Sequence, residues 1–250
     1  MAGGVVKVMR EIPVWGTIVF IECDGPDRDA LEKGIDQCAD YFNQVDELFS
    51  TYKEQSQVSK LRRGELKIAD CAPDLQEVWQ RCLQMKEITE GAFDPWCLDG
   101  GFDPSGYVKG WASDKAIAIL RKYGATFIQV NGAGDLSLFS GPHKIGIRSP
   151  DDAKVILKVF ELSGGAIATS GTYERGSHIR DPHTSLIAIG ARSATVVGPD
   201  GGIADALATA LIVAGRDGAH WFSKGELAEY SAWVIDRHEE VAWSVGYGHG

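Results

Sequence analysis

Residues 203–215 have the sequence IADALATALIVAG, a run of apolar and helix-forming residues that ends at a glycine. Because apolar side chains occupy nearly every position around this predicted helix, we expect it to be buried between other layers of the protein. Its two polar side chains, Asp205 and Thr209, are four residues apart and should lie on the same face, about 6 Å from each other. A buried carboxylate at such a position requires a partner.

Two interpretations of this pair are open from the helix alone. In one, Asp205 caps the helix and Thr209 hydrogen-bonds to the backbone carbonyl four residues earlier. In the other, the carboxylate, the hydroxyl and a backbone carbonyl hold a hard cation, since Mg²⁺ takes oxygen ligands together with substrate phosphates.

The rest of the chain places helices early and strands late, which favours an α+β fold of mixed sheets with packed helices. We expect one compact unit over residues 1–250. Helices are predicted at 31–49, at 75–83 with Asp74 as N-cap and Gly91 as stop, at 110–123 and at 203–214, with a short helical turn at 220–223. Strands are predicted within 5–23 and at 125–130, 144–148, 154–162, 186–197, 227–235 and 240–245. The turn at 131–135 (NGAGD) lacks the third glycine of a dinucleotide fingerprint, and no helix follows it, so a Rossmann fold is not expected.

Composition narrows the class of protein. The net charge of −10 argues against nucleic-acid or anionic-membrane binding. No apolar run approaches the ~20 residues of a transmembrane helix. The five cysteines are odd in number and form no CxxC motif, and no signal peptide or lipid-anchor motif is present. These features favour reduced thiols and a cytoplasmic location.

Two polar loops are candidates for binding or catalysis. Residues 166–185 (AIATSGTYERGSHIRDPHTS) concentrate hydroxyls, charges and His178 between two apolar runs, which is typical of either an active-site loop or a solvated hairpin. Residues 91–110 combine Lys109 and three aspartates with five glycines, which suits a phosphate site but equally an ordinary surface loop. No Walker A or HExxH pattern occurs, so neither a P-loop nor a catalytic zinc is expected.

The order of several motifs resembles the FAD:protein FMN transferases, the ApbE-type flavin transferases. These motifs are WGT (15–17), STY (50–52), GAFDP (91–95), DPSGYVKG (103–110), NGAGD (131–135), ATSGTYER…HIRDP (168–182) and ADALATA (204–210). The resemblance implies an ApbE-like (T-fold-like) fold and an Mg²⁺-dependent enzyme. Such an enzyme transfers the FMN half of FAD onto a Ser or Thr hydroxyl of an acceptor flavoprotein and releases AMP.

The resemblance also assigns roles to individual residues. Asp205, Thr209 and the carbonyl of Gly106 correspond to Mg²⁺ ligands, and His178 corresponds to the family's histidine and is our candidate for the base. The residues that correspond to FAD contacts are Trp15, Tyr52, Ala92, Phe93, Asp94, Asp103, Lys109 and Arg180.

The chain departs from the family pattern at four places. Trp15 stands where Met is usual, Gly-Ala-Gly replaces Gly-Gly in the 131–135 turn, and Ser185 replaces the glycine that ends the DPxTG motif. Only Trp96 to Phe102 stand where the family inserts several tens of residues. Because a short segment could admit water, an FAD pyrophosphatase that yields FMN and AMP is one alternative function, and a non-catalytic FAD-binding protein is another.

Overall fold

The computed structural model describes residues 4–97, 100–172, 179–237 and 241–246. Within these residues, eight strands form one antiparallel sheet in the order β1-β2-β3-β4-β7-β8-β9-β10, and two more form a separate hairpin, β5-β6. The large sheet consists of β1 (Val6–Val14), β2 (Thr17–Gly25), β3 (Phe127–Gly132), β4 (Leu136–Phe139), β7 (Gly165–Gly171), β8 (Ala191–Gly198), β9 (Ser231–Asp236) and β10 (Ala242–Gly246). The hairpin consists of β5 (His143–Arg148) and β6 (Ile156–Leu162).

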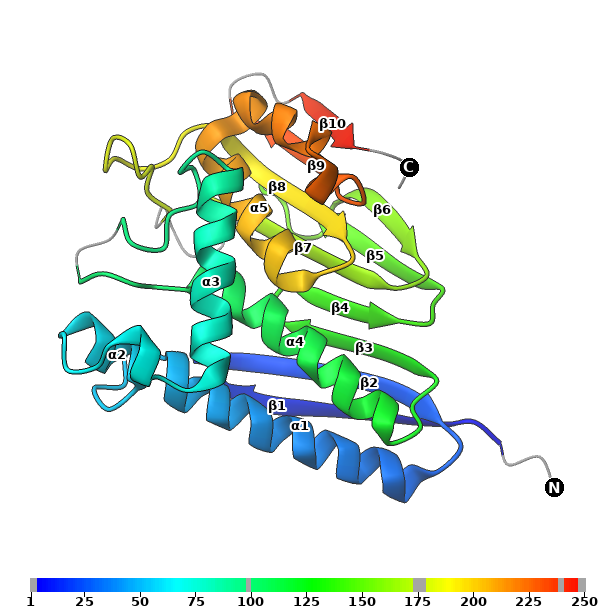
Figure 1. Cartoon of the computed structure of the whole chain (residues 1–250). Helices are drawn as coiled ribbons and strands as arrows, with labels where there is room; N and C mark the ends of the chain where they lie inside the picture. The colour runs from blue at the N-terminus through cyan, green and yellow to red at the C-terminus, as the bar shows by residue number, and fades with distance from the viewer. Residues whose placement is uncertain (1–3, 98–99, 173–178, 238–240, 247–250) are drawn as a thin grey trace.

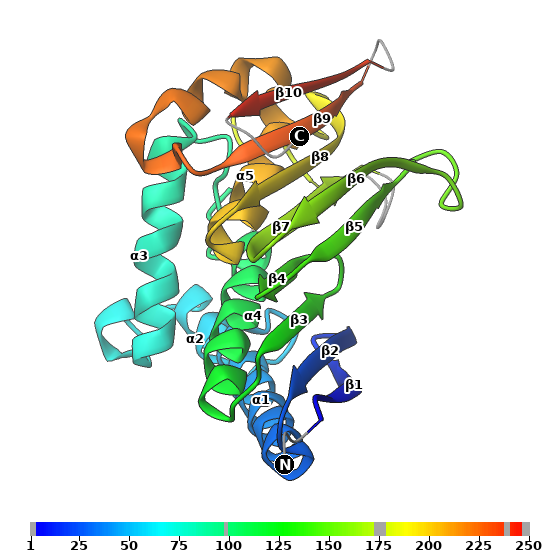
Figure 2. The ribbon, with the colours of Figure 1, turned by 90° about the vertical axis from the view of Figure 1, so that its right-hand side faces the viewer.

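Helices cover one face of the large sheet, and the β5-β6 hairpin lies on the other face (Figures 1 and 2). The helices are α1 (Arg28–Phe49), α2 (Gln57–Arg62), α3 (Pro73–Ile88), α4 (Ser105–Lys122) and α5 (Gly201–Ala214). Three short 3₁₀ segments span Ile68–Asp70, Gly215–Ser223 and Gly225–Leu227. A large apolar core fills the helical side, and a smaller one beneath the hairpin includes Phe160 and Ile167. The predicted α+β class is therefore confirmed, and the sheet has no Rossmann topology.

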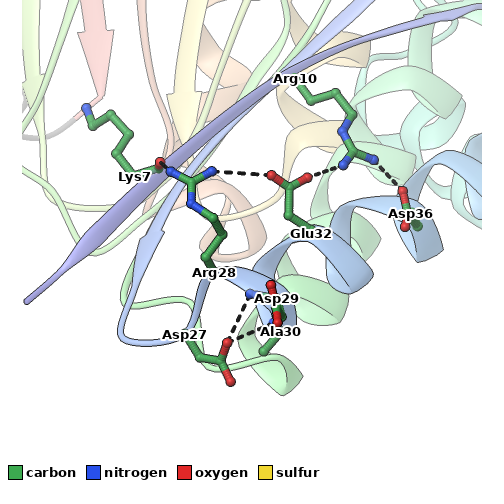
Figure 3. Close-up of polar contacts among 8 residues, drawn as sticks. All are labelled: Lys7, Arg10, Asp27, Arg28, Asp29, Ala30, Glu32 and Asp36. Atoms are coloured by element: carbon green, nitrogen blue, oxygen red, sulfur yellow. Dashed lines mark hydrogen bonds and ion pairs between the residues drawn. The ribbon is translucent and has the colours of Figure 1, made fainter. Parts of the chain in front are cut away.

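The first helix shows how the sequence pattern produces the packing. The apolar residues of α1 that are spaced by three and four positions are all buried, namely Leu31, Ile35, Cys38, Phe42, Val45 and Phe49. Asp27 caps the helix, since its carboxylate accepts hydrogen bonds from the backbone N–H groups of Asp29 (2.9 Å) and Ala30 (3.2 Å). Figure 3 shows Arg10 of β1 paired with Glu32 and Asp36 of α1, which ties the helix to the edge strand.

Helix α5 is almost entirely apolar in sequence, and most of its residues are buried. Asp200 caps it through a 2.9 Å hydrogen bond from the N–H of Ile203. Its first turn crosses α4 so closely that a Cβ atom on Gly110 would lie 2.2 Å from the carbonyl oxygen of Gly201. Glycine is therefore required at this crossing, and the close approach brings side chains of α4 and α5 together.

Some predicted boundaries were wrong. Asp74 is not an N-cap, because α3 begins at Pro73 after Ala72, and Asp74 instead accepts a hydrogen bond from the hydroxyl of Tyr41 (3.2 Å). Helix α4 begins at Ser105 rather than 110; a kink at Gly106 lies inside its first turn. The predicted strand at 186–197 begins only at Ala191, and the one at 227–235 begins at Ser231 after a 3₁₀ turn.

Three elements escaped sequence-based prediction. Helix α2 and strand β4 are short, with six and four residues. Strand β7 extends through Ser170 to Gly171 into what the sequence suggested to be a loop. Among the helices in the described part of the chain, none has the length and apolarity needed to cross a bilayer.

Candidate active site

A cavity of about 530 Å³ lies where α4, α5 and the end of β7 meet. Its size is that of a typical small-molecule site. The cavity is lined by ten of the predicted site residues: Tyr52, Ala92, Phe93, Asp94, Asp103, Gly106, Lys109, Arg180, Asp205 and Thr209. These ten residues come from five separate parts of the sequence, which the fold brings together at one cavity.

Lys109 is the electrostatic centre of this cavity. Its ammonium lies 3.1 Å from Oδ2 of Asp135 and 3.4 Å from Oδ2 of Asp205, and both carboxylates are almost completely buried. Burial would lower the pKa of Lys109, but the charges of Asp135 and Asp205 outweigh burial and raise that pKa. Lys109 is therefore a permanent cation, held in place by two anions.

The partner that a buried Asp205 requires is thus Lys109, on another helix. The interpretation of Asp205 as a helix cap is wrong, because Asp200 caps α5 and Asp205 lies in its second turn. The hydroxyl of Thr209 is 3.2 Å from the hydroxyl of Ser170 on β7, so Thr209 also faces the cavity.

Gly106 lies directly against Thr209. A Cβ atom at Gly106 would be 3.3 Å from Oγ1 of Thr209, and the backbone there departs from helical geometry (φ −86°, ψ 19°). Asp205, Thr209 and Gly106 therefore border one corner of the cavity, where this chain can offer a carboxylate, a hydroxyl and a main-chain carbonyl. These are hard oxygen donors of the kind that suit Mg²⁺. No group of three or more His, Cys, Asp or Glu side chains that could hold a metal occurs among the described residues, so substrate phosphates and water would have to complete such a site.

The segment between the GAFDP and DPSGYVKG motifs is short but well anchored at both ends. The N–H of Asp103 donates a 2.7 Å hydrogen bond to the carbonyl of Pro95, so the two ends of this segment are held together. Trp96 and Phe102 pack on each other (5.1 Å between ring centres) and both pack on Trp79 of α3. Asp94, beside them, is paired with Lys86 at 2.7 Å.

The remaining predicted residues differ in their placement. Tyr52 borders the cavity with 96% of its surface exposed, free to lie against a ligand. Arg180 also borders the cavity, and its guanidinium donates to the carbonyl of Ser185 (3.0 Å). Trp15 does not line the cavity; its indole packs on Phe42 and donates to that residue's carbonyl (3.2 Å). His178 lies outside the described residues.

Two residues of the site were missed. Asp135 is the last residue of the NGAGD motif, and its place in that motif was the signal available from the sequence. Ser170 lies within the polar stretch 166–185, and the extension of β7 directs it towards Thr209.

Asp114 of α4 links three elements next to the cavity. It accepts hydrogen bonds from the N–H of Gly201 (2.7 Å) at the start of α5 and from the hydroxyl of Ser137 (2.5 Å) on β4. Burial raises the pKa of Asp114 to about 7, against the opposing effect of these two donors. One carboxyl group therefore fixes α5 relative to α4 and the sheet.

Replacing Asp114 by Asn is expected to change the pH dependence of stability. A carboxyl whose pKa is raised on folding stabilises the protein most below its unfolded pKa, and this contribution is lost as pH rises through the folded value near 7. An uncharged Asn can accept from Gly201 and donate to Ser137 at every pH. Relative to the wild type, the variant should gain about 3 kcal/mol of unfolding free energy between pH 5 and pH 8, measured by urea denaturation. An identical difference between the two proteins at both pH values would contradict this role.

Comparison with known proteins gives a consistent result. The model of the ApbE family matches residues 15–99 and 98–233. A curated relative, the FAD:protein FMN transferase of Rhodobacter capsulatus, is 36% identical over 127 residues, which cover 46% of this chain and 24% of the relative. The chain therefore spans about a quarter of the length of that protein.

Solved structures share the fold at lower sequence identity. The flavin transferase ApbE from Vibrio cholerae superposes with a TM-score of 0.82 at 21% identity, covering 97% of this chain and 98% of the other. The apo flavinyl transferase ApbE of Pseudomonas stutzeri gives 0.81 at 22% identity, with 96% and 95% covered. The ApbE protein of Thermotoga maritima gives 0.82 at 21%, with 96% and 97% covered. Since the family model extends over most of the sequence and the fold agrees over nearly all of it, this chain belongs to the ApbE family.

Proposed function

We propose that the protein transfers the FMN half of FAD onto a Ser or Thr hydroxyl of an acceptor protein and releases AMP. Membership of the ApbE family and the name of the Rhodobacter capsulatus relative support this activity. The observation that carries the proposal is the corner formed by Asp205, Thr209 and Gly106 beside Lys109, in a cavity large enough for a nucleotide.

The charge of the cavity supports a role for Mg²⁺. Lys109 is already shared between Asp135 and Asp205, so it cannot neutralise a diphosphate by itself. Asp205, Thr209 and the carbonyl of Gly106 would hold the cation, which would supply charge neutralisation and polarisation of the phosphorus under attack. The same oxygens without a cation would repel a diphosphate.

The chain's own residues would bind and orient the substrate. Lys109 contributes a fixed positive charge, and Arg180 contributes a second cationic group to the lining. Tyr52, which is exposed at the rim, offers an aromatic face to the flavin. Such transfer depends mainly on positioning and charge stabilisation, which preformed groups of this kind provide.

In the proposed reaction, the acceptor's hydroxyl oxygen forms a bond to the FMN-side phosphorus, and the bond from that phosphorus to the AMP-side oxygen breaks. AMP leaves with the electron pair of the broken bond. The hydroxyl proton goes to a base, and we propose His178 for this role, because an imidazole titrates near pH 6.5 and can accept a proton at neutral pH.

Replacing His178 by Ala is expected to slow FMN transfer by about a hundredfold, as is typical for loss of a general base. FAD affinity should change little, because the histidine would act on the acceptor's proton. Single-turnover transfer rates and FAD titrations measure the two effects separately. A transfer rate equal to that of the wild type would eliminate His178 as the base.

The activity itself is tested by incubating candidate acceptor proteins with FAD, Mg²⁺ and this protein, and measuring by mass spectrometry an added FMN. A parallel reaction without acceptor tests the alternative of FAD hydrolysis: AMP released at the same rate would favour a pyrophosphatase. A protein that binds FAD but releases no AMP with any acceptor would instead be a flavin-binding protein.

We also propose a cytoplasmic location. All five cysteines are free and four of them are buried, which fits a reducing compartment. Recovery of the protein in the membrane or periplasmic fraction of its cells would contradict this location.

A further inference from the structure

The β5-β6 hairpin lies on the face of the large sheet that the helices leave open (Figure 2). Beside it is a second cavity of about 750 Å³, lined by residues of β5 and of the large sheet. We call it the hairpin groove. Its floor includes Ile18 and Phe20 of β2, which are 39% and 46% exposed, together with Leu136 and Ile167. Apolar side chains left open in a hollow of this size are typical of a binding surface.

One wall of the hairpin groove is the edge of a strand. Five consecutive residues, Lys144 to Arg148, line the groove, whereas no described residue of β6 does. Because successive side chains of a strand point in opposite directions, an unbroken run of lining residues means that the backbone edge faces the groove. Strand β5 pairs only with β6, so this edge carries unpaired N–H and C=O groups among the described residues. An open edge of this kind is a template for an added strand.

The hairpin groove adjoins the cavity that contains Lys109, because the two share lining residues. Ala133 and Thr169 line both. Ala133 lies in the turn between β3 and β4, and Thr169 lies on β7, where its hydroxyl is 2.9 Å from that of Thr195. A chain lying along β5 would therefore pass directly beside the cavity that contains Lys109.

The charge of the groove indicates which kind of chain would fit. The ammonium of Lys144 is 2.9 Å from the carboxylate of Glu161 on β6 and is thus neutralised. Arg148 lies at the other end of the same wall, and its guanidinium forms no hydrogen bond or ion pair with any residue in the described part of the chain. The wall therefore presents one uncompensated positive charge, which favours an acidic partner.

We propose that the hairpin groove binds the acceptor protein, as an extended segment that pairs with β5 and presents its Ser or Thr hydroxyl at the junction formed by Ala133 and Thr169. Apolar side chains of the segment pack on Ile18 and Phe20, and an acidic side chain pairs with Arg148. This inference rests on the proposed function, because the segment is the substrate of the transfer.

The test uses ten-residue peptides with one central Thr, in an acidic pool whose flanking residues include Asp and Glu and a basic pool that includes Lys and Arg. Hydrogen–deuterium exchange measures protection of residues 144–148, mass spectrometry measures FMN transfer, and fluorescence titration measures FAD binding. The acidic pool should protect β5 and become modified. Phe20→Glu and Arg148→Glu should each raise the KM for the acidic pool about tenfold and leave the Kd for FAD unchanged.

Met9→Glu is the matched control. Met9 lies on β1 on the same face of the sheet, is 68% exposed and does not line the groove, so its replacement should leave KM unchanged. Absence of protection at 144–148, protection by the basic pool alone, or a weakened FAD affinity in Phe20→Glu would each overturn the proposal. Protection of β5 by acidic peptides without FMN transfer would support the groove and refute the transferase. Transfer that is insensitive to both variants would refute the groove alone.

Discussion

Replacing Asp205 by Asn is expected to reduce the rate of FMN transfer by about a thousandfold, because it removes the charge from the cavity-lining carboxylate that lies one helical turn before Thr209 on α5. The amide has the shape of the carboxylate, so packing in α5 is preserved. Lys109 keeps Asp135 as a partner, at 3.1 Å. The fold should therefore survive, and the loss should appear in the reaction.

The same variant should need much more Mg²⁺ for its remaining activity, since a neutral amide is a poorer ligand than a carboxylate. A titration of transfer rate against Mg²⁺ concentration, with circular dichroism as a check of folding, measures this. An Asp205→Asn protein that keeps both the activity and the metal dependence of the wild type would contradict the proposed site.

Asp135→Asn is the appropriate control for this experiment. Asp135 is the other carboxylate on Lys109, but it comes from the β3–β4 turn rather than from α5. If Asp205 served only to hold Lys109, the two variants would lose activity equally. We expect Asp135→Asn to retain at least about ten times more activity than Asp205→Asn, and equal losses would show that Asp205 acts through Lys109 alone.

The ion pair between Asp205 and Lys109 was only partly predictable from the sequence. The apolar helix predicted that Asp205 would be buried and need a partner, and both points are confirmed. It could not identify Lys109, which is 96 residues away. That contact arises because Gly110 and Gly201 let α4 and α5 approach closely, and such a crossing has no local periodicity to reveal it.

Departures from the family pattern were visible in the sequence, but their backbone conformation was not. Ala133 and Ser185 both adopt left-handed φ values, 67° and 62°. Glycine takes this conformation without strain, whereas other residues incur about 1 kcal/mol. The family's glycine at the position of Ser185 is thus explained by the turn, which Asp181 stabilises through hydrogen bonds from the N–H of His183 and the hydroxyl of Thr184 (both 2.8 Å).

Replacing Lys109 by Met is expected to destabilise the protein by about 3 kcal/mol at pH 7, because it leaves two buried carboxylates without a counter-charge. The aliphatic part of the side chain is retained, so the loss reports the charge rather than a cavity. Asp135 and Asp205 would also repel each other, and FAD would lose its fixed cation. Urea denaturation measures the stability and a fluorescence titration measures the FAD affinity.

The cause of this loss can be identified by its pH dependence and by a charge-retaining control. Protonation of either orphaned carboxylate relieves the repulsion, so the difference between Lys109→Met and the wild type should shrink as pH falls from 7 towards 5. Lys109→Arg keeps the positive charge and should recover most of the stability, but less of the transfer rate, because a guanidinium is wider than an ammonium and directs its hydrogen bonds differently. Two results would contradict this explanation: a destabilisation of Lys109→Met that is equal at both pH values, or an Arg variant as unstable as the Met variant. Either would mean that Lys109 stabilises the protein by packing rather than by the charge that pairs with Asp135 and Asp205.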